Sequence, residues 1–187
     1  MQKAITYFSI LRNNRGVEMT ASSFFDIPSV IDKSNLPFIM KRLDAEQFAF
    51  VTFLTPQCKD KFREILRDFF NKKITLEQAV IRVNNEISPP FGYKRVDRWQ
   101  ERAVRSEVSK IFTLGYGDYL LSLGETECFI PHTSFDESAE CTVLIAGKKF
   151  LIKDIQNNIY KNYKLKHPAF PTVPLHANCR HIITKVQ

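Results

Sequence analysis

Residues 96–123 read VDRWQERAVRSEVSKIFTLGYGDYLLSL and carry a helical pattern over their whole length. The apolar residues keep near-helical spacing, at Trp99, Ala103, Val104, Val108, Ile111, Phe112, Tyr119 and Leu120. This spacing predicts one long helix that ends at Gly124, since glycine readily adopts the left-handed conformation that terminates helices. Gly115 and Gly117 weaken the second half of this helix, because glycine is a poor helix former.

Two more helices are predicted before this stretch. One has an apolar stripe with spacing i, i+3, i+4, i+7 and i+8, formed by Phe62, Ile65, Leu66, Phe69 and Phe70. The other starts at Thr75-Leu-Glu-Gln78, which matches a capping box, and runs to about residue 87. Ser88-Pro-Pro follows and ends it.

The chain before these helices gives weaker signals. Residues 44–54 are apolar and aromatic with an acidic start, and we expect a buried helix there. Residues 5–11 suit a short helix. The dipeptides Ile27-Pro and Leu36-Pro are expected to break any longer element, which leaves the first forty or so residues as loose or docking material.

After Gly124 the pattern changes to short β-like pieces. Residues 127–131 form one expected strand, and residues 141–146 and 149–152 suggest a hairpin around a Gly147-Lys turn. A last strand is expected over 181–186. Residues 155–173 suit a helical turn followed by an exposed loop.

The expected fold class is therefore α+β, with N-terminal helices followed by a small antiparallel, meander-like sheet. We divide the chain into a mostly helical region, 1–90, and a module, 91–187, that combines the long helix with the sheet. A chain of 187 residues with 44% hydrophobic residues is long and apolar enough to bury a hydrophobic core.

The chain is basic, with 27 Lys and Arg against 20 Asp and Glu, a net charge of +7 and a pI near 9.3. This balance favours contact with DNA or RNA, although no run of five like charges concentrates the field. No apolar stretch approaches the 18 residues of a membrane span. The four cysteines are irregularly spaced and the start lacks a signal-peptide pattern, so we expect reduced thiols in a cytoplasm.

The segment Pro174-Leu-His-Ala-Asn-Cys-Arg-His181 crowds two His, a Cys, an Arg and an Asn into eight positions. In one interpretation it is a structural anchor, in which Asn178 and Arg180 make hydrogen bonds and Cys179 fills the core. In a second it contributes to a zinc site, whose candidate ligands are Cys141, His176, Cys179 and His181. No cofactor is otherwise indicated.

A third interpretation of the same segment is acid–base chemistry on RNA. His176 or His181 would move protons while Arg180 stabilises the charged phosphate, with Arg105 or Glu107 added from the long helix. Arg98, Arg102 and Arg105 also lie on one flank of that helix, where they would contact phosphate or simply face solvent.

The order of these segments resembles the phage Mu F-like head-morphogenesis family along nearly the whole chain. Three of the matching blocks are Ala4-Ile-Thr-Tyr-Phe, Phe48-Ala-Phe-Val-Thr and Ile74-Thr-Leu-Glu-Gln. The fourth is made of several stretches: Arg102–Lys110 with Gly115 or Gly117, Ser134–Cys141, Gly147-Lys-Lys-Phe150 and Pro174–His181. The family's last block is commonly Pro-Pro-Leu-His-Pro-Asn-Cys-Arg. This chain has Val173 and Ala177 at two of those prolines, and Ser138 where relatives often begin a Cys-x-x-Cys that ends at Cys141.

The resemblance implies a minor head, or minor capsid, protein encoded by a phage or prophage and present in few copies at the portal vertex or inside the head. Its partners would be a portal or capsid protein and DNA, bound without sequence preference, and no membrane. It would lie in the host cytoplasm during assembly and then in the virion head. We expect a structural and not an enzymatic role. The alternative is a small metal-independent ribonuclease toxin, because the C-terminal sheet of this family looks similar to such toxins.

Overall fold

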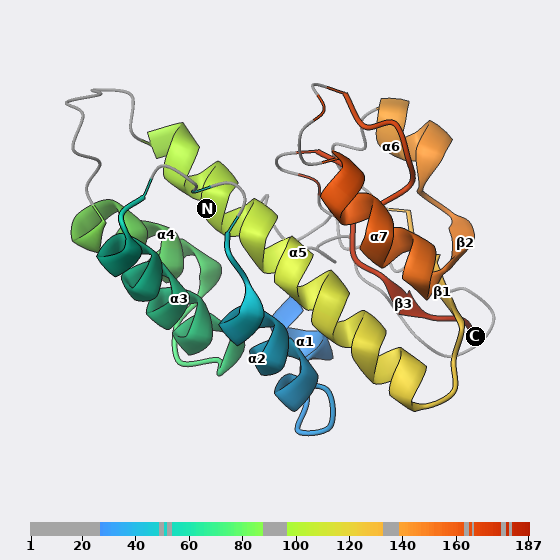
Figure 1. The fold of residues 1–187 in the computed structure, drawn as a ribbon, viewed down its shortest axis with the longest axis horizontal. Coiled ribbons are helices and arrows are strands. Elements are labelled where there is room, and N and C mark those ends of the chain that lie inside the picture. The colour runs from blue at the N-terminus through green and yellow to red at the C-terminus, as the bar shows by residue number, and fades with distance from the viewer. Residues whose placement is uncertain are drawn as a thin grey trace, which may run out of the picture.

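A long central helix, α5 (Asp97–Ser122), crosses the molecule and separates two sets of elements (Figure 1). The computed structural model describes residues 27–48, 51, 54–87, 97–132, 139–162, 165, 167–176, 179 and 181–187. Helices α1 to α4 lie on one side of α5, and the sheet with α6 and α7 lies on the other. The predicted long helix is confirmed.

The expected stop at Gly124 is also confirmed, and its hydrogen bonds explain it. Gly124 has φ +82°, a conformation that costs little without a Cβ. Its amide donates to the carbonyl of Leu121 at 3.0 Å, and the amide of Glu125 donates to the carbonyl of Leu120 at 3.1 Å. This pattern is a Schellman motif, which satisfies the last carbonyls of α5.

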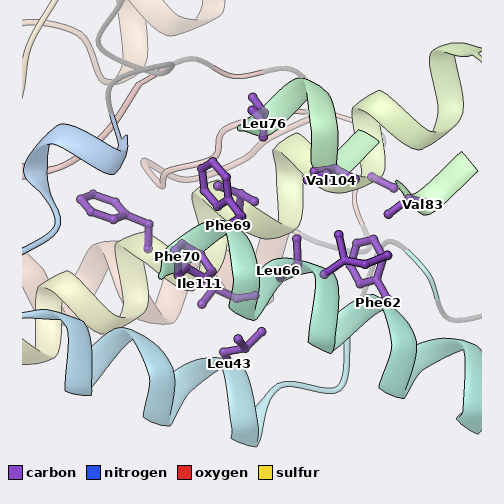
Figure 2. Close-up of a cluster of buried hydrophobic side chains, with 14 of the residues drawn as sticks. Leu43, Phe62, Leu66, Phe69, Phe70, Leu76, Val83, Val104 and Ile111 are labelled. Carbon is purple, nitrogen blue, oxygen red and sulfur yellow. The ribbon is translucent and has the colours of Figure 1, made fainter. Parts of the chain in front are cut away.

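The helical half contains α1 (Ile27–Val30), α2 (Leu36–Ala45), α3 (Pro56–Phe70) and α4 (Leu76–Glu86). The predicted apolar stripe of α3 is buried and packs in one core with α2, α4 and α5 (Figure 2). The capping box of α4 is present as expected: Gln78 N–H donates to Thr75 Oγ1 at 3.2 Å, and Thr75 N–H donates to Gln78 Oε1 at 2.8 Å.

Three expectations for the chain before α3 were wrong or lie outside the described residues. No element runs through Leu36-Pro, but the dipeptide begins α2, because proline fits the first turn, where no amide partner is needed, so this part of the chain is not loose. Ile27-Pro likewise begins the short α1. The expected helix over 44–54 is not formed, since α2 ends at Ala45. Residues 5–11 lie outside the described part.

Arg63 of α3 accounts for the early end of α2. Its guanidinium donates to the carbonyls of Leu43, at 3.3 Å, and Glu46, at 2.8 Å, which a continuing helix would need for itself. Phe48 then adopts φ +51° and is fully buried, with its ring 5.1 Å from that of Phe62. Among the described residues after α2, Phe48, Val51 and Leu54 are therefore buried without belonging to a helix.

The sheet contains β1 (Glu127–Ile130), β2 (Lys148–Leu151) and β3 (Thr184–Lys185) in the order β2-β1-β3, with both pairings antiparallel. The α+β architecture with helices first is confirmed. The strand order differs from a meander, because the first strand lies in the middle. The final strand is shorter than the 181–186 expected.

The expected strand over 141–146 was wrong, and with it the hairpin. These residues fall in α6 (Ala139–Leu144) and the turn after it, and β2 pairs with β1 instead. Thr142, Val143 and Ile145 favour strands by composition. The pattern of burial is that of a helix, however, because Cys141 and Ile145 are buried while Val143, which a strand would place on the same face, is 66% exposed.

Helix α7 (Ile152–Asn162) replaces the single helical turn expected after residue 155. Its buried face consists of Ile152, Ile155, Gln156 and Ile159, at helical spacing. A loop follows α7 as expected, since residues 167–173 contain no helix or strand, but it is exposed only in its first part, because Thr172 and Val173 are fully buried. Helix α7 packs its buried face toward α5 and a second core, which contains Leu120, Cys128, Ile130, Cys141, Ile145, Leu175, Cys179 and Ile183.

Two adjacent residues near the end of the sequence connect the two cores. Ile182 belongs to the core of the helical half, and Ile183 belongs to the core of the sheet module. Neighbouring side chains of an extended chain point in opposite directions, so one short segment contributes to both.

The two glycines of α5 allow close approach of its neighbours. A Cβ on Gly115 would overlap the backbone of Ile39 in α2 and lie 2.8 Å from its nitrogen. A Cβ on Gly117 would meet the side chains of Gln156 and Ile152 in α7. Between these contacts Asp118 accepts hydrogen bonds from Arg42 of α2, at 2.5 and 2.7 Å, and from Gln156, at 3.1 Å.

We predict that Gly115→Ala lowers the free energy of unfolding by about 2 kcal/mol, the middle of the range for overpacked sites. Alanine favours helices by about 1 kcal/mol over glycine, but the backbone of Ile39 cannot rotate away as a side chain can. Urea unfolding followed by circular dichroism measures the change. Ser122→Ala, at an exposed position of the same helix, is the control. A Gly115→Ala protein as stable as this control would contradict the close-approach argument.

Candidate functional site

Cys141, His176 and Cys179 converge in the sheet module. One ligand-type atom from each, two thiol sulfurs and an imidazole nitrogen, all lie within 4.8 Å of one another. Cys141 Sγ is 3.1 Å from His176 Nε2. Both thiols are buried, and His176 is partly exposed. Three of the four residues expected as zinc ligands are therefore together, although they come from segments 35 positions apart.

Two local features bring these side chains together. Helix α6 and the turn after it direct Cys141 and Ile145 into the second core, since the amide of Ile145 donates to the carbonyl of Cys141 at 2.9 Å and residues four apart share a helix face. The second feature is a turn, in which the amide of Cys179 donates to the carbonyl of His176 at 3.0 Å. This turn places the imidazole and the thiol of a short segment side by side.

Asparagines of α7 hold the loop that leads to this turn. Asn158 donates to the carbonyl of Pro171 at 3.0 Å, and Asn162 donates to that of Phe170 at 2.7 Å. Asn162 Oδ1 also accepts from the amide of Ala169 at 3.1 Å. The irregular chain after α7 is thus fixed by side-chain hydrogen bonds, and Val173 and Leu175 anchor it in the core.

The two thiols of the site share a hydrogen bond. This bond to Cys141, together with complete burial, raises the pKa of Cys179 well above the usual thiol range. Without a metal ion, the thiol of Cys179 is therefore held protonated and does not resemble an activated nucleophile, which needs a lowered pKa. Cys128 lies in the same core, where burial raises its pKa to about 12, but it is not part of the three-residue group.

His181, the fourth residue expected as a zinc ligand, stands beside the group without joining it. Its Nδ1 is 3.6 Å from Cys179 Sγ, and its side chain is buried. Asn178 and Arg180 lie outside the described residues, so the proposed anchor role of those two side chains stays a prediction. Pro174 is buried, as an anchoring segment requires.

The residues named for ribonuclease chemistry do not meet in an open site within the described part of the chain. Glu107 is fully buried and lies 3.5 Å from Lys110. Arg105 is 12% exposed and pairs with Glu101 at 2.7 Å. A general acid or base must reach a substrate, and the burial of His181 and Glu107 does not favour that role.

The arginine flank expected on α5 is divided. Arg102 is exposed, whereas Arg105 is mostly covered and held by Glu101. The side chain of Arg98 lies outside those that the structure describes. Contact of this flank with phosphate stays a prediction, with Arg102 as its accessible member.

Sequence reasoning missed a buried ion pair that joins α5 to the end of α2. Lys110 is 1% exposed, and its ammonium lies 2.6 Å from a carboxylate oxygen of Glu46. The two residues are 64 positions apart, and no local pattern connects them. The signal in the sequence was a lysine among the apolar residues of the long helix, which indicates a buried charge that needs a partner.

Comparison with protein-family models, curated proteins and solved structures gave no match. The resemblance to the head-morphogenesis family therefore rests on the motif blocks alone. Among the described residues, none of the helices combines the length and the hydropathy needed to cross a membrane.

We predict that Lys110→Met lowers the free energy of unfolding by about 3 kcal/mol or more, because it leaves the carboxylates of Glu46 and Glu107 buried without their cation. Urea unfolding measures the loss. The double variant Glu46→Gln, Lys110→Met should recover part of it, since one uncompensated charge is then removed. If the double variant loses as much unfolding free energy as Glu46→Gln and Lys110→Met lose together, Glu46 and Lys110 are not coupled.

Proposed function

We propose that the protein is a minor head protein of a phage or prophage, with a structural role in head assembly and a direct association with the packaged DNA. The order of the motif blocks along the chain supports the family. The concentration of positive charge in residues 139–187 supports a DNA contact in that part of the chain. The helical half would dock on a portal or capsid protein, and the sheet module would contact DNA.

The concentration of positive charge in residues 139–187, the C-terminal part of the sheet module, carries this proposal. Residues 139–187 contain eight Lys and Arg and two acidic residues, so they hold +6 of the net +7. The remaining 138 residues are nearly balanced, with 19 basic and 18 acidic residues. A polyanion would therefore be attracted to residues 139–187 more than to residues 124–138 before them, which contain four acidic residues and no Lys or Arg.

Exposed lysines of β2 and α7 are the best candidates for phosphate contact. Lys149 and Lys153 are exposed and lie close together in sequence, at the end of the sheet and the start of α7. Lys161 is also exposed. Lys185 is committed to an ion pair with Glu125 at 2.7 Å. These lysines replace the α5 arginines as the main expected contacts.

The ribonuclease alternative receives no specific support from the described residues. Its histidine His181 and its carboxylate Glu107 are both buried, and the thiols beside His176 suit metal binding better than proton transfer. We therefore do not propose catalysis.

We predict weak, sequence-independent DNA binding that falls steeply as salt rises, because phosphate contacts release counterions. The double variant Lys149→Gln, Lys153→Gln should bind several-fold more weakly. The slope of log affinity against log salt should become shallower by about 1.8, since each duplex phosphate contact contributes ~0.9. Fluorescence anisotropy with a labelled duplex over a salt series measures both.

The matched control is Lys33→Gln, Lys41→Gln, which removes the same charge from exposed positions of the helical half. This control should leave the slope unchanged. Equal losses in both double variants would mean that only net charge matters, and affinity that is constant through the salt series would contradict the proposal. Cleavage of total RNA that His176→Ala abolishes would favour the ribonuclease instead.

The head role itself is tested in the bacterium that encodes the chain. After induction of the phage, heads purified on a density gradient should contain the protein in few copies, together with portal protein. Its complete absence from both assembling and mature heads, with heads formed normally after deletion of its gene, would overturn the assignment.

A further inference from the structure

We propose that Cys141, His176 and Cys179 bind one zinc ion, which ties helix α6 to the segment before β3. This site does not depend on the head role and would hold for either function of the chain. It rests on three donor atoms that converge from α6 and from the irregular segment that contains residues 173–176 and 179.

The spacing of the donors fits a tetrahedral ion. Zinc–sulfur and zinc–nitrogen bonds of about 2.3 and 2.1 Å place neighbouring donors roughly 3.6–3.8 Å apart. The 3.1 Å between Cys141 Sγ and His176 Nε2 and the 4.8 Å limit on the whole group lie on either side of that value. Small side-chain rotations are therefore enough to admit the ion.

The donor types select the metal. Two thiolates and an imidazole form a borderline-soft set that suits zinc, whereas magnesium and calcium require oxygen ligands. On binding, each thiol loses its proton to solvent, two zinc–sulfur bonds and one zinc–nitrogen bond form, and nothing is oxidised or reduced.

The sheet module has a physical need for such a link. Its described strands are four, four and two residues long, and residues 167–176 and 179, in the segment that carries His176 and Cys179, belong to no strand. Small cores of this kind commonly depend on a metal or a disulfide. Zinc would join that segment to α6 inside the second core.

The surroundings of the site define the roles of its neighbours. The described residues provide three ligands, and a fourth position is left for water or another donor. His181, 3.6 Å from Cys179 Sγ, is a positioning residue that orients the thiolate. Loss of such an outer partner typically weakens metal affinity by about 10- to 100-fold.

The experiment measures zinc in the full chain after purification without chelator, by plasma mass spectrometry. We expect about one zinc ion per chain, because the three ligands form a single site. Cys141→Ala, His176→Ala and Cys179→Ala should each lose most of it. Cys128→Ala, which removes a buried thiol from the same core, should keep it. His181→Ala should keep zinc at saturation but release it faster to a competing chelator.

A second measurement uses the chain without substitutions, so it tests the site even if the ligand variants do not fold. Cobalt added to the chelator-treated protein should give tetrahedral visible bands and a thiolate charge-transfer band, which stoichiometric zinc abolishes. Zinc should also protect Cys141 and Cys179, but not the partly exposed Cys58, from iodoacetamide.

Each opposing outcome overturns the proposal. A chain without zinc that gives no thiolate band with cobalt has no such site. Full zinc content in folded His176→Ala or Cys179→Ala places the ion elsewhere. A disulfide between Cys141 and Cys179 in freshly purified protein, detected as a mass lower by two hydrogens, assigns the pair a covalent link instead.

Discussion

The close approach of α2 to the backbone of α5 at Gly115 is the contact on which the rest of the fold depends. It lets α5 serve as a common wall, with the helical core on one face and the sheet module on the other. The hydrogen bonds of Arg42 and Gln156 to Asp118 then fix α2 and α7 to that wall from both sides. A bulkier residue at this point would separate α2 from α5, and the carboxylate of Asp118 would lose its geometry with Arg42.

The features that the sequence revealed are those encoded within a few residues. The stripe of Phe62 and Leu66, the capping box at Thr75 and the stop at Gly124 depend on spacing that a helix imposes locally, and all three are present. The grouping of Cys141 with His176 and Cys179 was expected from residue type alone. This grouping could be predicted because cysteine and histidine are the residue types that supply sulfur and nitrogen ligands to zinc.

The features that could not be predicted from the sequence depend on residues that are far apart along the chain. Thr142 and Val143 favour a strand by propensity, but burial of Cys141 and Ile145 on one side decides for a helix. The end of α2 is set by Arg63, which lies in the following helix and binds its last carbonyls. Similarly, no local rule pairs Lys110 with Glu46. In each case tertiary packing outweighs a modest local preference.

Ile182 and Ile183 have a consequence for the synthesis of the protein. The segment that contains them contributes one side chain to each core, and the strand that follows pairs with the central strand β1. Neither half can close its core while this segment is still inside the ribosome, although α2 to α4 emerge much earlier. Folding is therefore completed only after residues 181–185 have left the exit tunnel.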